Sequence, residues 1–315
     1  MPKVLITGAG GFVGTHLINE LKKSPENEIY ASVYKATSDI TTLVDQTHII
    51  AGDLTDYAFA ESLVKSVQPD VIFHLAALSV VHNSASLATS VMSSNATISY
   101  NMLEATKLYA SRARFIAISS GNVYGAVEDT TRPVDELTPL RPLNPYAVSK
   151  VTQEMLALQY SLSYGLDVVI LRPFNHTGVG QTRDFVIPRL AHQFVQIEKK
   201  LLDPVIEVGN IETIRDFTDV ADMVRGYVLA SQKCISGEIY NIGTGVGHTI
   251  AEIIEILKSL SSAKVEVKIL DKLVRASDVP ILVADASKFM DLTGWKPQVS
   301  LQDTISDILE SYRLT

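Results

Sequence analysis

The N-terminal sequence that decides the fold is Lys3-Val4-Leu5-Ile6-Thr7-Gly8-Ala9-Gly10-Gly11-Phe12-Val13-Gly14. Residues 3–7 form an apolar run typical of a buried strand, and residues 12–23 continue with apolar side chains at helical spacing. The glycines between them, spaced G-x-x-G-x-x-G, allow a tight turn and bring the N–H groups at the start of the helix close to a pyrophosphate. The stretch therefore predicts a dinucleotide-binding βαβ unit. The residues expected at the cofactor here are Gly8, Gly11, Phe12, Val13 and Gly14.

Apolar strand candidates alternate with helical stretches through the first half of the chain. Strands are predicted at 3–7, 28–33, 49–51, 71–75, 114–118 and 167–171, and helices at 12–23, 57–67, 95–109 and 146–163. This alternation is typical of a parallel sheet covered by helices on both faces, which also explains why the strands are almost wholly apolar. We predict an α/β fold: a Rossmann-type, doubly wound parallel sheet with a smaller C-terminal α/β substrate-binding region.

The alternation ends after Arg172. Residues 174–182 predict a loop, and shorter strands and helices are predicted at 205–208, 220–231, 238–242, 250–260 and 265–270. We assign residues 1–172 to the NAD(P)-binding Rossmann domain, with 216–242 returning to it. Residues 173–215 and 243–315 are assigned to the substrate-binding region.

The composition excludes several classes of protein. The 315 residues are 46% hydrophobic and 20% charged, which is ordinary for a globular chain. The chain has a net charge of −8, whereas nucleic-acid-binding proteins usually have an excess of basic residues. The single cysteine, Cys234, cannot form a disulfide within the chain, and the sequence has no signal-peptide or membrane-spanning pattern. We therefore expect a soluble cytoplasmic protein with no metal and no nucleic-acid or membrane partner.

The ends of three further strands are expected to contact the cofactor. After the third strand, the Asp53 carboxylate can accept a hydrogen bond from an adenine amino group or cap the following helix. The second strand ends without an acid that could bind the ribose hydroxyls, whereas Ser32 and Lys35 can bind a 2′-phosphate. This favours NADP(H), with NAD(H) as the alternative. The other cofactor-binding candidates are Leu54, Leu75, Ala76 and Ala77.

Tyr146 and Lys150 lie four residues apart in a predicted helix, so their side chains share a face. Reduction of a carbonyl needs a proton donor beside the group that receives hydride. The pKa of a free tyrosine is about 10, and we expect the Lys150 ammonium to lower the pKa of Tyr146 toward working pH. Lys150 can also hold the nicotinamide ribose, and Ser120, after the 114–118 strand, can hydrogen-bond the reacting oxygen.

In these residues the chain resembles the extended short-chain dehydrogenase/reductases, the NAD-dependent epimerase/dehydratase family. The resemblance covers essentially the whole chain and includes Asp53-Leu54, His74-Leu75-Ala76-Ala77, Ser119-Ser120 and Arg172-Pro173-Phe174-Asn175. It implies that Ser120, Tyr146 and Lys150 are the catalytic set and that the substrate is a nucleotide sugar. It also implies a homodimer formed through the helices at 95–109 and 146–163.

The reactions of this family differ in the acid–base groups that they need. Its dehydratases place a glutamate two residues after the catalytic hydroxyl, where this chain has Asn122, and neither Gly121 nor Asn122 can transfer a proton. The next carboxylates, Glu128 and Asp129, are expected on a surface loop. A 4-keto reductase and a 4-epimerase both need only serine, tyrosine and lysine, so the local chemistry leaves these two activities open.

The second half of the chain resembles the GDP-4-keto-6-deoxy-D-mannose reductases. The similar segments are 175–181, 184–186, 208–210, 215–220, 275–280 and 293–297. The resemblance implies NAD(P)H-dependent reduction of the C4 keto group of GDP-4-keto-6-deoxy-D-mannose to GDP-D-rhamnose. A nucleotide-sugar 4-epimerase with tightly bound NAD is the alternative, and a GDP-mannose 4,6-dehydratase is less favoured.

Guanidinium groups match phosphate oxygens bidentately, so Arg215 and Arg275 are expected at the substrate diphosphate, with surface ion pairs as the alternative. His176 is expected to be structural, Cys234 a bystander and Trp295 part of the core. The remaining substrate-binding candidates are Asn122, Asn175, Phe185, Val186, Arg189 and Asp278.

Overall fold

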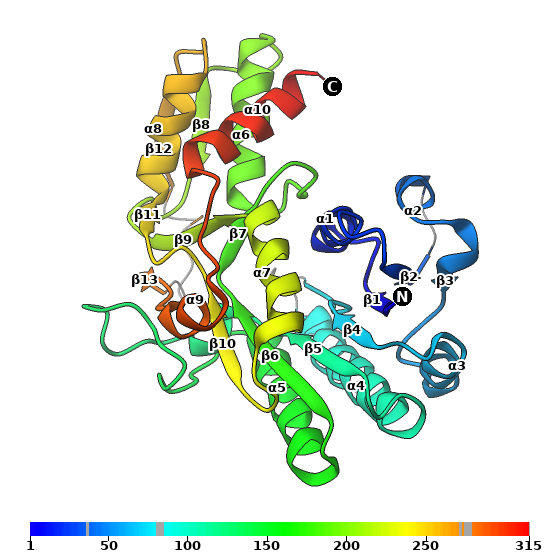
Figure 1. Ribbon diagram of the computed structural model, residues 1–315. Helices are drawn as coiled ribbons and strands as arrows, with labels where there is room; N and C mark the ends of the chain where they lie inside the picture. The colour runs from blue at the N-terminus through cyan, green and yellow to red at the C-terminus, as the bar shows by residue number, and fades with distance from the viewer. Residues whose placement is uncertain (36–37, 80–84, 271–272, 274–278, 315) are drawn as a thin grey trace.

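A seven-stranded sheet forms the centre of the computed structural model, which describes residues 1–35, 38–79, 85–270, 273 and 279–314 (Figure 1). The strand order is β10-β6-β5-β4-β1-β2-β3, and every neighbouring pair is parallel. The strands are β1 (Lys3–Thr7), β2 (Glu28–Val33), β3 (Ile49–Ala51), β4 (Val71–His74), β5 (Arg114–Ile118), β6 (Asp167–Pro173) and β10 (Ile239–Ile242). The predicted α/β, Rossmann-type fold is confirmed.

Helices cover both faces of this sheet, as Figure 1 shows. One face packs against α1 (Phe12–Leu21), α2 (Ser38–Leu43) and α7 (Val220–Lys233), and the other against α3 (Tyr57–Val67), α4 (Ala85–Tyr109) and α5 (Pro145–Tyr164). Neighbouring residues on one strand, such as Leu5 and Ile6, are both fully buried but belong to different cores. Burial on both sides is the reason that these strands are continuous apolar runs.

The strand order reverses between β1 and β4, because the chain fills the sheet outward from β1 to β3 and then returns to the other side of β1. Ligands of such sheets bind at this switch point, at the carboxyl ends of the strands. Gly8 lies there with a φ of +70°, and a Cβ on it would lie 2.9 Å from the backbone of Ala76. Only glycine fits so close to the end of β4.

A smaller region follows β6. Its four-stranded sheet contains β7 (Asn175–Thr177), β9 (Ile214–Asp219), β11 (Gly247–Thr249) and β13 (Ile281–Leu282), while β8 (Val205–Val208) pairs with β12 (Glu266–Ile269). The helices α6 (Val186–Glu198), α8 (Ile250–Leu260) and α10 (Leu301–Arg313) share an apolar core and lie at the upper left of Figure 1. The remaining short helices are α9 (Ser287–Thr293), η1 (Gln46–His48) and η2 (Gly121–Tyr124).

Two predicted elements were wrong. The helix predicted at 95–109 begins ten residues earlier, at Ala85. Its start was missed because these ten residues are mostly small and polar and show little apolar periodicity. The loop predicted at 174–182 contains β7, a polar three-residue strand that forms by pairing with β9, some forty residues later. Of the segment predicted to return to the Rossmann domain, α7 and β10 belong to the large sheet layer, whereas β9 pairs within the smaller sheet.

Among the described residues, no helix is both long enough and apolar enough to cross a bilayer.

The close packing of α1 on β1 is tested by Gly14→Ala, whose Cβ would lie 2.6 Å from the Ala9 carbonyl oxygen. Overpacking costs about 1–3 kcal/mol, which exceeds the roughly 1 kcal/mol that alanine gains over glycine in a helix. We expect a lower free energy of unfolding in urea. The control is Gly10→Ala, whose Cβ would lie 3.4 Å from Val33. Equal stability of the two variants would contradict this packing.

Candidate active site

The glycine loop after β1 has the form of an anion site. Gly11 caps α1 with no side chain to occupy the first N–H groups of the helix, which belong to Phe12 and Val13. Free N–H groups and the helix dipole favour a phosphate at such an end. Gly8 and Gly14 leave no room for a Cβ, so the backbone of the loop lies close to its neighbours at the start of α1. These features fit the pyrophosphate of a dinucleotide.

A buried hydrogen-bond network joins the carboxyl ends of β1 and β4. The Thr7 hydroxyl lies 2.9 Å from Nδ1 of His74 and accepts a hydrogen bond from the N–H of Ala76 at 3.2 Å. Nε2 of His74 lies 3.3 Å from the Ser99 hydroxyl, and burial lowers the pKa of His74 to about 3. The imidazole is therefore neutral and structural. Through Thr7 it positions Ala76 beside Gly8 of the glycine loop. Leu75, Ala76 and Ala77, which follow β4, are half-buried.

Asp53 follows β3 and is exposed. Its Oδ1 accepts hydrogen bonds from the N–H and the hydroxyl of Thr55, at 2.8 and 2.7 Å. The cap of α3 is instead Asp56, so the helix-cap alternative for Asp53 was wrong. Leu54 is buried, and its carbonyl accepts from the Asn101 amide at 2.9 Å.

The end of β2 carries no carboxylate next to the glycine loop. Its last residue is the buried Val33, whose Cγ1 would be 3.4 Å from a Cβ on Gly10. The Ser32 hydroxyl is buried, and within the described part of the chain it has no hydrogen-bond partner. Lys35 is exposed, with its Nζ 5.9 Å from the centre of the Tyr34 ring.

Ser120 and Tyr146 come together at the carboxyl edge of β5. Ser120 caps η2, where its Oγ accepts from the Asn122 N–H at 3.2 Å and hydrogen-bonds with the Tyr146 phenol. Asn144 caps α5 and Pro145 opens it, which places Tyr146 in the first turn. Burial raises the pKa of Tyr146 to about 12, although the hydrogen bond with Ser120 acts in the opposite direction. The expected lowering of this pKa was therefore wrong.

Lys150 lies one turn after Tyr146 on α5, with its Nζ 5.8 Å from the centre of the Tyr146 ring. The ammonium donates to the Ile118 carbonyl at 2.7 Å and to Oε1 of Gln153 at 2.9 Å. Burial lowers the pKa of Lys150 to about 8, and the nearby Glu154 carboxylate partly offsets the shift.

Glu154, which sequence reasoning missed, is fully buried one turn after Lys150. It accepts from Nε and NH2 of Arg172 at 3.0 and 2.7 Å, and from the Ser119 hydroxyl. NH1 of Arg172 donates to the buried Tyr124 hydroxyl at 3.0 Å. A charge pair buried this deeply requires such complete pairing. The only sequence signal was an acid four residues after the lysine, on the same helical face.

Asn95 was also missed as a site residue. Its Oδ1 accepts from the Leu78 N–H at 2.7 Å, and its amide donates to the Ser149 hydroxyl at 2.9 Å. It thus ties the segment after β4 to the helix that carries Tyr146 and Lys150. No feature of the sequence distinguishes it from other polar residues of α4.

Of the predicted substrate residues that the structure describes, Asn122 lies on η2 after β5 and the others lie on the smaller region. Asn175 on β7 is in register with Phe217 on β9, two residues after Arg215. The Arg215 guanidinium donates to the carbonyls of Ile214 and Pro280, at 2.8 and 3.4 Å. Phe185, 39% exposed, caps α6 without a side-chain hydrogen bond, and Val186, half-buried, begins that helix. Asn122 is half-buried and Arg189 is exposed, while Arg275 and Asp278 lie outside the described residues.

Asp216, the neighbour of Arg215, organises this sheet. Its buried carboxylate accepts from the Thr244 N–H and hydroxyl and from the N–H groups of Gly245 and Ala284. The sequence marks Asp216 only as part of the segment 215–220, because its partners lie some thirty and seventy residues later in the chain.

Four other expectations concerned residues without a role in the reaction. His176 is held by its Nδ1–H, which donates to the Phe174 carbonyl at 3.0 Å, and burial lowers its pKa, so it is neutral. Glu128 and Asp129 are exposed. Cys234 and Trp295 are buried, and the indole N–H donates to the Asp222 carbonyl at 2.9 Å.

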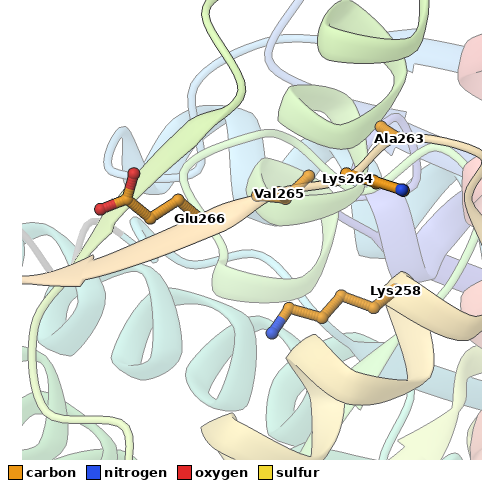
Figure 2. Close-up of a pocket in the computed structure, with 5 residues that line it drawn as sticks. All are labelled: Lys258, Ala263, Lys264, Val265 and Glu266. Atoms are coloured by element: carbon orange, nitrogen blue, oxygen red, sulfur yellow. The ribbon is translucent and has the colours of Figure 1, made fainter.

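A surface hollow between the end of α8 and the start of β12 is a separate feature (Figure 2). Its lining residues are Lys258, Ala263, Lys264, Val265 and Glu266. The charged ends of Lys264 and Glu266 point away from each other, and Lys258 pairs with Glu255 at 2.8 Å. None of the predicted site residues lines it.

Comparison with known proteins finds relatives over nearly the whole chain. The family model described as GDP-mannose 4,6 dehydratase matches residues 5–308. The chain is 29% identical to the GDP-6-deoxy-D-mannose reductase of Pseudomonas aeruginosa over 310 residues, which cover 98% of this chain and 97% of the relative. It is 31% identical to the GDP-6-deoxy-D-talose 4-dehydrogenase of Aggregatibacter actinomycetemcomitans over 293 residues, covering 93% and 91%.

A solved structure is similarly close. The structure of RMD from Pseudomonas aeruginosa complexed with NADPH matches with a TM-score of 0.87 and 29% identity, and covers 100% of this chain and 99% of that one. The family match spans nearly the whole chain. The protein therefore belongs to the GDP-mannose 4,6-dehydratase family of the extended short-chain dehydrogenase/reductases.

Proposed function

We propose that this protein is an NADP(H)-dependent reductase that converts the C4 keto group of GDP-4-keto-6-deoxy-D-mannose to the alcohol of GDP-D-rhamnose. The observation that carries the proposal is the placement of Ser120 next to Tyr146 at the carboxyl edge of the sheet, with Gly121 and Asn122 after Ser120 rather than a carboxylate. Reduction needs one hydride and one proton, and this pair supplies the proton. Two relatives named for GDP-6-deoxyhexose chemistry, similar over nearly the full chain, support the substrate class.

The chain's own residues supply the acid chemistry. The reduced nicotinamide, when bound, supplies the hydride to C4 of the sugar. The Ser120 and Tyr146 hydroxyls hydrogen-bond the keto oxygen, and the phenolic proton of Tyr146 moves to that oxygen as the carbonyl becomes an alcohol. The Lys150 ammonium stabilises the phenolate that remains until a solvent proton replaces the one transferred.

The residues after Ser120 support reduction over dehydration. Burial raises the pKa of Tyr146 to about 12, so the phenol carries the proton that reduction needs. A dehydratase needs a further acid–base pair beside the sugar, and Asn122 cannot transfer a proton. The relatives named for GDP-6-deoxyhexose chemistry favour reduction over epimerisation.

The end of β2 supports NADP(H) over NAD(H). A carboxylate at this point would bind the two ribose hydroxyls, but β2 ends on the apolar Val33 beside the loop. The exposed Lys35 that follows is free of the core and can pair with a 2′-phosphate. The adenine is assigned to the exposed carboxylate of Asp53.

The nucleotide sugar is assigned to residues 173–215 and 243–315. Arg215, held by two backbone carbonyls, would bind the diphosphate, and Asn175 on the neighbouring strand would bind a sugar or phosphate oxygen. The start of α6, where Phe185 and Val186 leave the first N–H groups uncapped by a side chain, and the exposed Arg189 would complete this side.

We further propose a cytoplasmic homodimer formed through α4 and α5. These helices pack against each other, and their outer faces expose Tyr100, Leu108, Met155 and Leu162, the last of which is 85% exposed. An interface between two copies of these helices would remove these apolar side chains from water. The single, buried cysteine is consistent with a reducing compartment.

The function is tested by mixing the purified protein with GDP-4-keto-6-deoxy-D-mannose and NADPH, following nicotinamide absorbance and identifying the sugar product. We expect one NADPH consumed for each GDP-D-rhamnose formed, and none consumed with GDP-mannose alone. Purified protein that contains tightly bound NAD and leaves added NADPH unused would reject the reductase in favour of the epimerase.

Tyr146→Phe removes only the phenolic hydroxyl. Positioned acids typically contribute about 10²–10⁴-fold to rate, so we expect kcat to fall by that order while the Kd for NADPH changes little. Steady-state kinetics and nicotinamide fluorescence measure the two quantities. A variant with undiminished kcat would refute the role of Tyr146 as the acid.

Lys35→Ala tests the cofactor preference. An exposed ion pair is worth about 1 kcal/mol or less, so we expect the KM for NADPH to rise by about 2- to 5-fold and the KM for NADH to stay the same. The matched control is Lys22→Ala, an exposed lysine at the far end of α1 from the glycine loop. Equal changes with both cofactors would exclude a contact between Lys35 and the 2′-phosphate.

Leu162→Glu places a charge on the exposed face of α5. We expect light scattering to give a dimeric mass for the unmodified protein and a lower mass for the variant, because a charge at an apolar interface loses hydration. A monomeric mass for the unmodified protein at assay concentration would refute the dimer.

A further inference from the structure

We propose that Gln153 is a positioning residue for the reaction, which holds the Lys150 ammonium charged and aims its remaining N–H at the bound cofactor. This inference rests on the proposed function. Gln153 lies on α5, three residues after Lys150, and is only 2% exposed. Its Oε1 accepts from the Lys150 Nζ at 2.9 Å.

The orientation of the Gln153 amide is dictated by the lysine. An ammonium has three donors and no acceptor, so only the amide oxygen can face it. The Nε2 group must then point into the interior, where it is buried and has no hydrogen-bond partner in the described part of the protein. An unpaired buried donor destabilises a fold. The favourable contact of this amide is therefore the one between Oε1 and Lys150.

The other titratable side chains that the structure describes around Lys150 are already paired or are neutral. The charged or titratable groups around Lys150 are Tyr146 and Glu154 on α5, Arg172 on β6 and His74 on β4. The oxygens of Glu154 already accept from Arg172 and Ser119, and His74 is neutral. The neutral amide of Gln153 therefore adds a second acceptor to the Ile118 carbonyl for this buried ammonium.

The two acceptors also fix the direction of the third N–H of the lysine. The Ile118 carbonyl takes one proton at 2.7 Å and Gln153 takes another. One donor is left for a ligand, and Ile118 is two residues before Ser120, at the edge where the cofactor binds. With an apolar side chain at position 153, the ammonium would lose an acceptor and give up its proton more readily.

The test uses two substitutions with opposite effects. Gln153→Met keeps the length and removes both amide groups, and Gln153→Glu adds a carboxylate beside the ammonium. We measure the pH dependence of the Kd for NADPH by nicotinamide fluorescence, and that of kcat/KM. Burial already lowers the pKa of Lys150 to about 8, so affinity should weaken as pH rises through this region.

The alkaline limb is the range of rising pH over which NADPH affinity falls. We expect it to move to lower pH in Gln153→Met, by about half a unit to one unit, and to higher pH in Gln153→Glu. The limb should be absent in Lys150→Met, which assigns it to this lysine. Thermal unfolding gives the second readout. Gln153→Met removes the unpaired Nε2 but also takes an acceptor from the buried ammonium, so its unfolding temperature should fall less than that of the control variant Gln181→Met.

The matched control is Gln181→Met. Gln181 is also buried, but both ends of its amide are paired, with the Thr177 hydroxyl at 2.8 Å and the His176 carbonyl at 3.1 Å. Its loss should lower the unfolding temperature and leave the alkaline limb of NADPH binding in place. A Gln153→Met variant that behaves like this control would overturn the inference.

The binding readout separates this inference from the proposed function. If the protein binds NADPH with the expected shifts but does not reduce the keto sugar, the proposed function fails and the role of Gln153 stands. If it reduces the sugar and neither substitution moves the limb, the role of Gln153 fails alone. If it does not bind NADPH, both are rejected.

Discussion

The close approach of Gly8 to Ala76, where the ends of β1 and β4 meet, is the constraint on which the rest of the structure depends. It lies at the point where the strand order reverses, so it also fixes where a ligand can bind. The neutral His74 at the end of β4 joins the two strand ends by its hydrogen bond with Thr7 at the end of β1. From this point the glycine loop leads to the start of α1, and the neighbouring strand β5 leads to Ser120. The site is thus assembled from the carboxyl edge of one sheet.

Burial decides the electrostatics of this edge. It raises the pKa of Tyr146 and lowers that of Lys150, so the phenol holds its proton firmly while the ammonium holds its proton weakly. The nearby carboxylate of Glu154 places its hydrogen bonds on Arg172 and Ser119 rather than on the lysine. This separation leaves the acid protonated and a positive charge close to it, as the proposed reduction requires. It also explains why a neutral amide contacts the lysine.

Much of the large sheet could be predicted from the sequence, because its strands are buried on both faces and its first turn needs glycine. Ser120, Tyr146 and Lys150 could be found because their spacing reflects local geometry. The smaller sheet could not, since short polar strands such as β7 acquire their structure from partners far along the chain. The direction of the Tyr146 pKa was missed for a related reason: four-residue spacing brings a lysine close but does not say how deeply either side chain is buried.

Hydride delivery to C4 of the sugar is the central claim, and an isotope label tests it most directly. The protein would be incubated with GDP-4-keto-6-deoxy-D-mannose and NADPH carrying deuterium at C4 of the nicotinamide, separately for each face of the ring. The sugar product would then be examined by NMR and mass spectrometry. One deuterium at C4 of GDP-D-rhamnose, from one of the two labelled forms only, is the predicted result. A product that carries no deuterium from either form would contradict it.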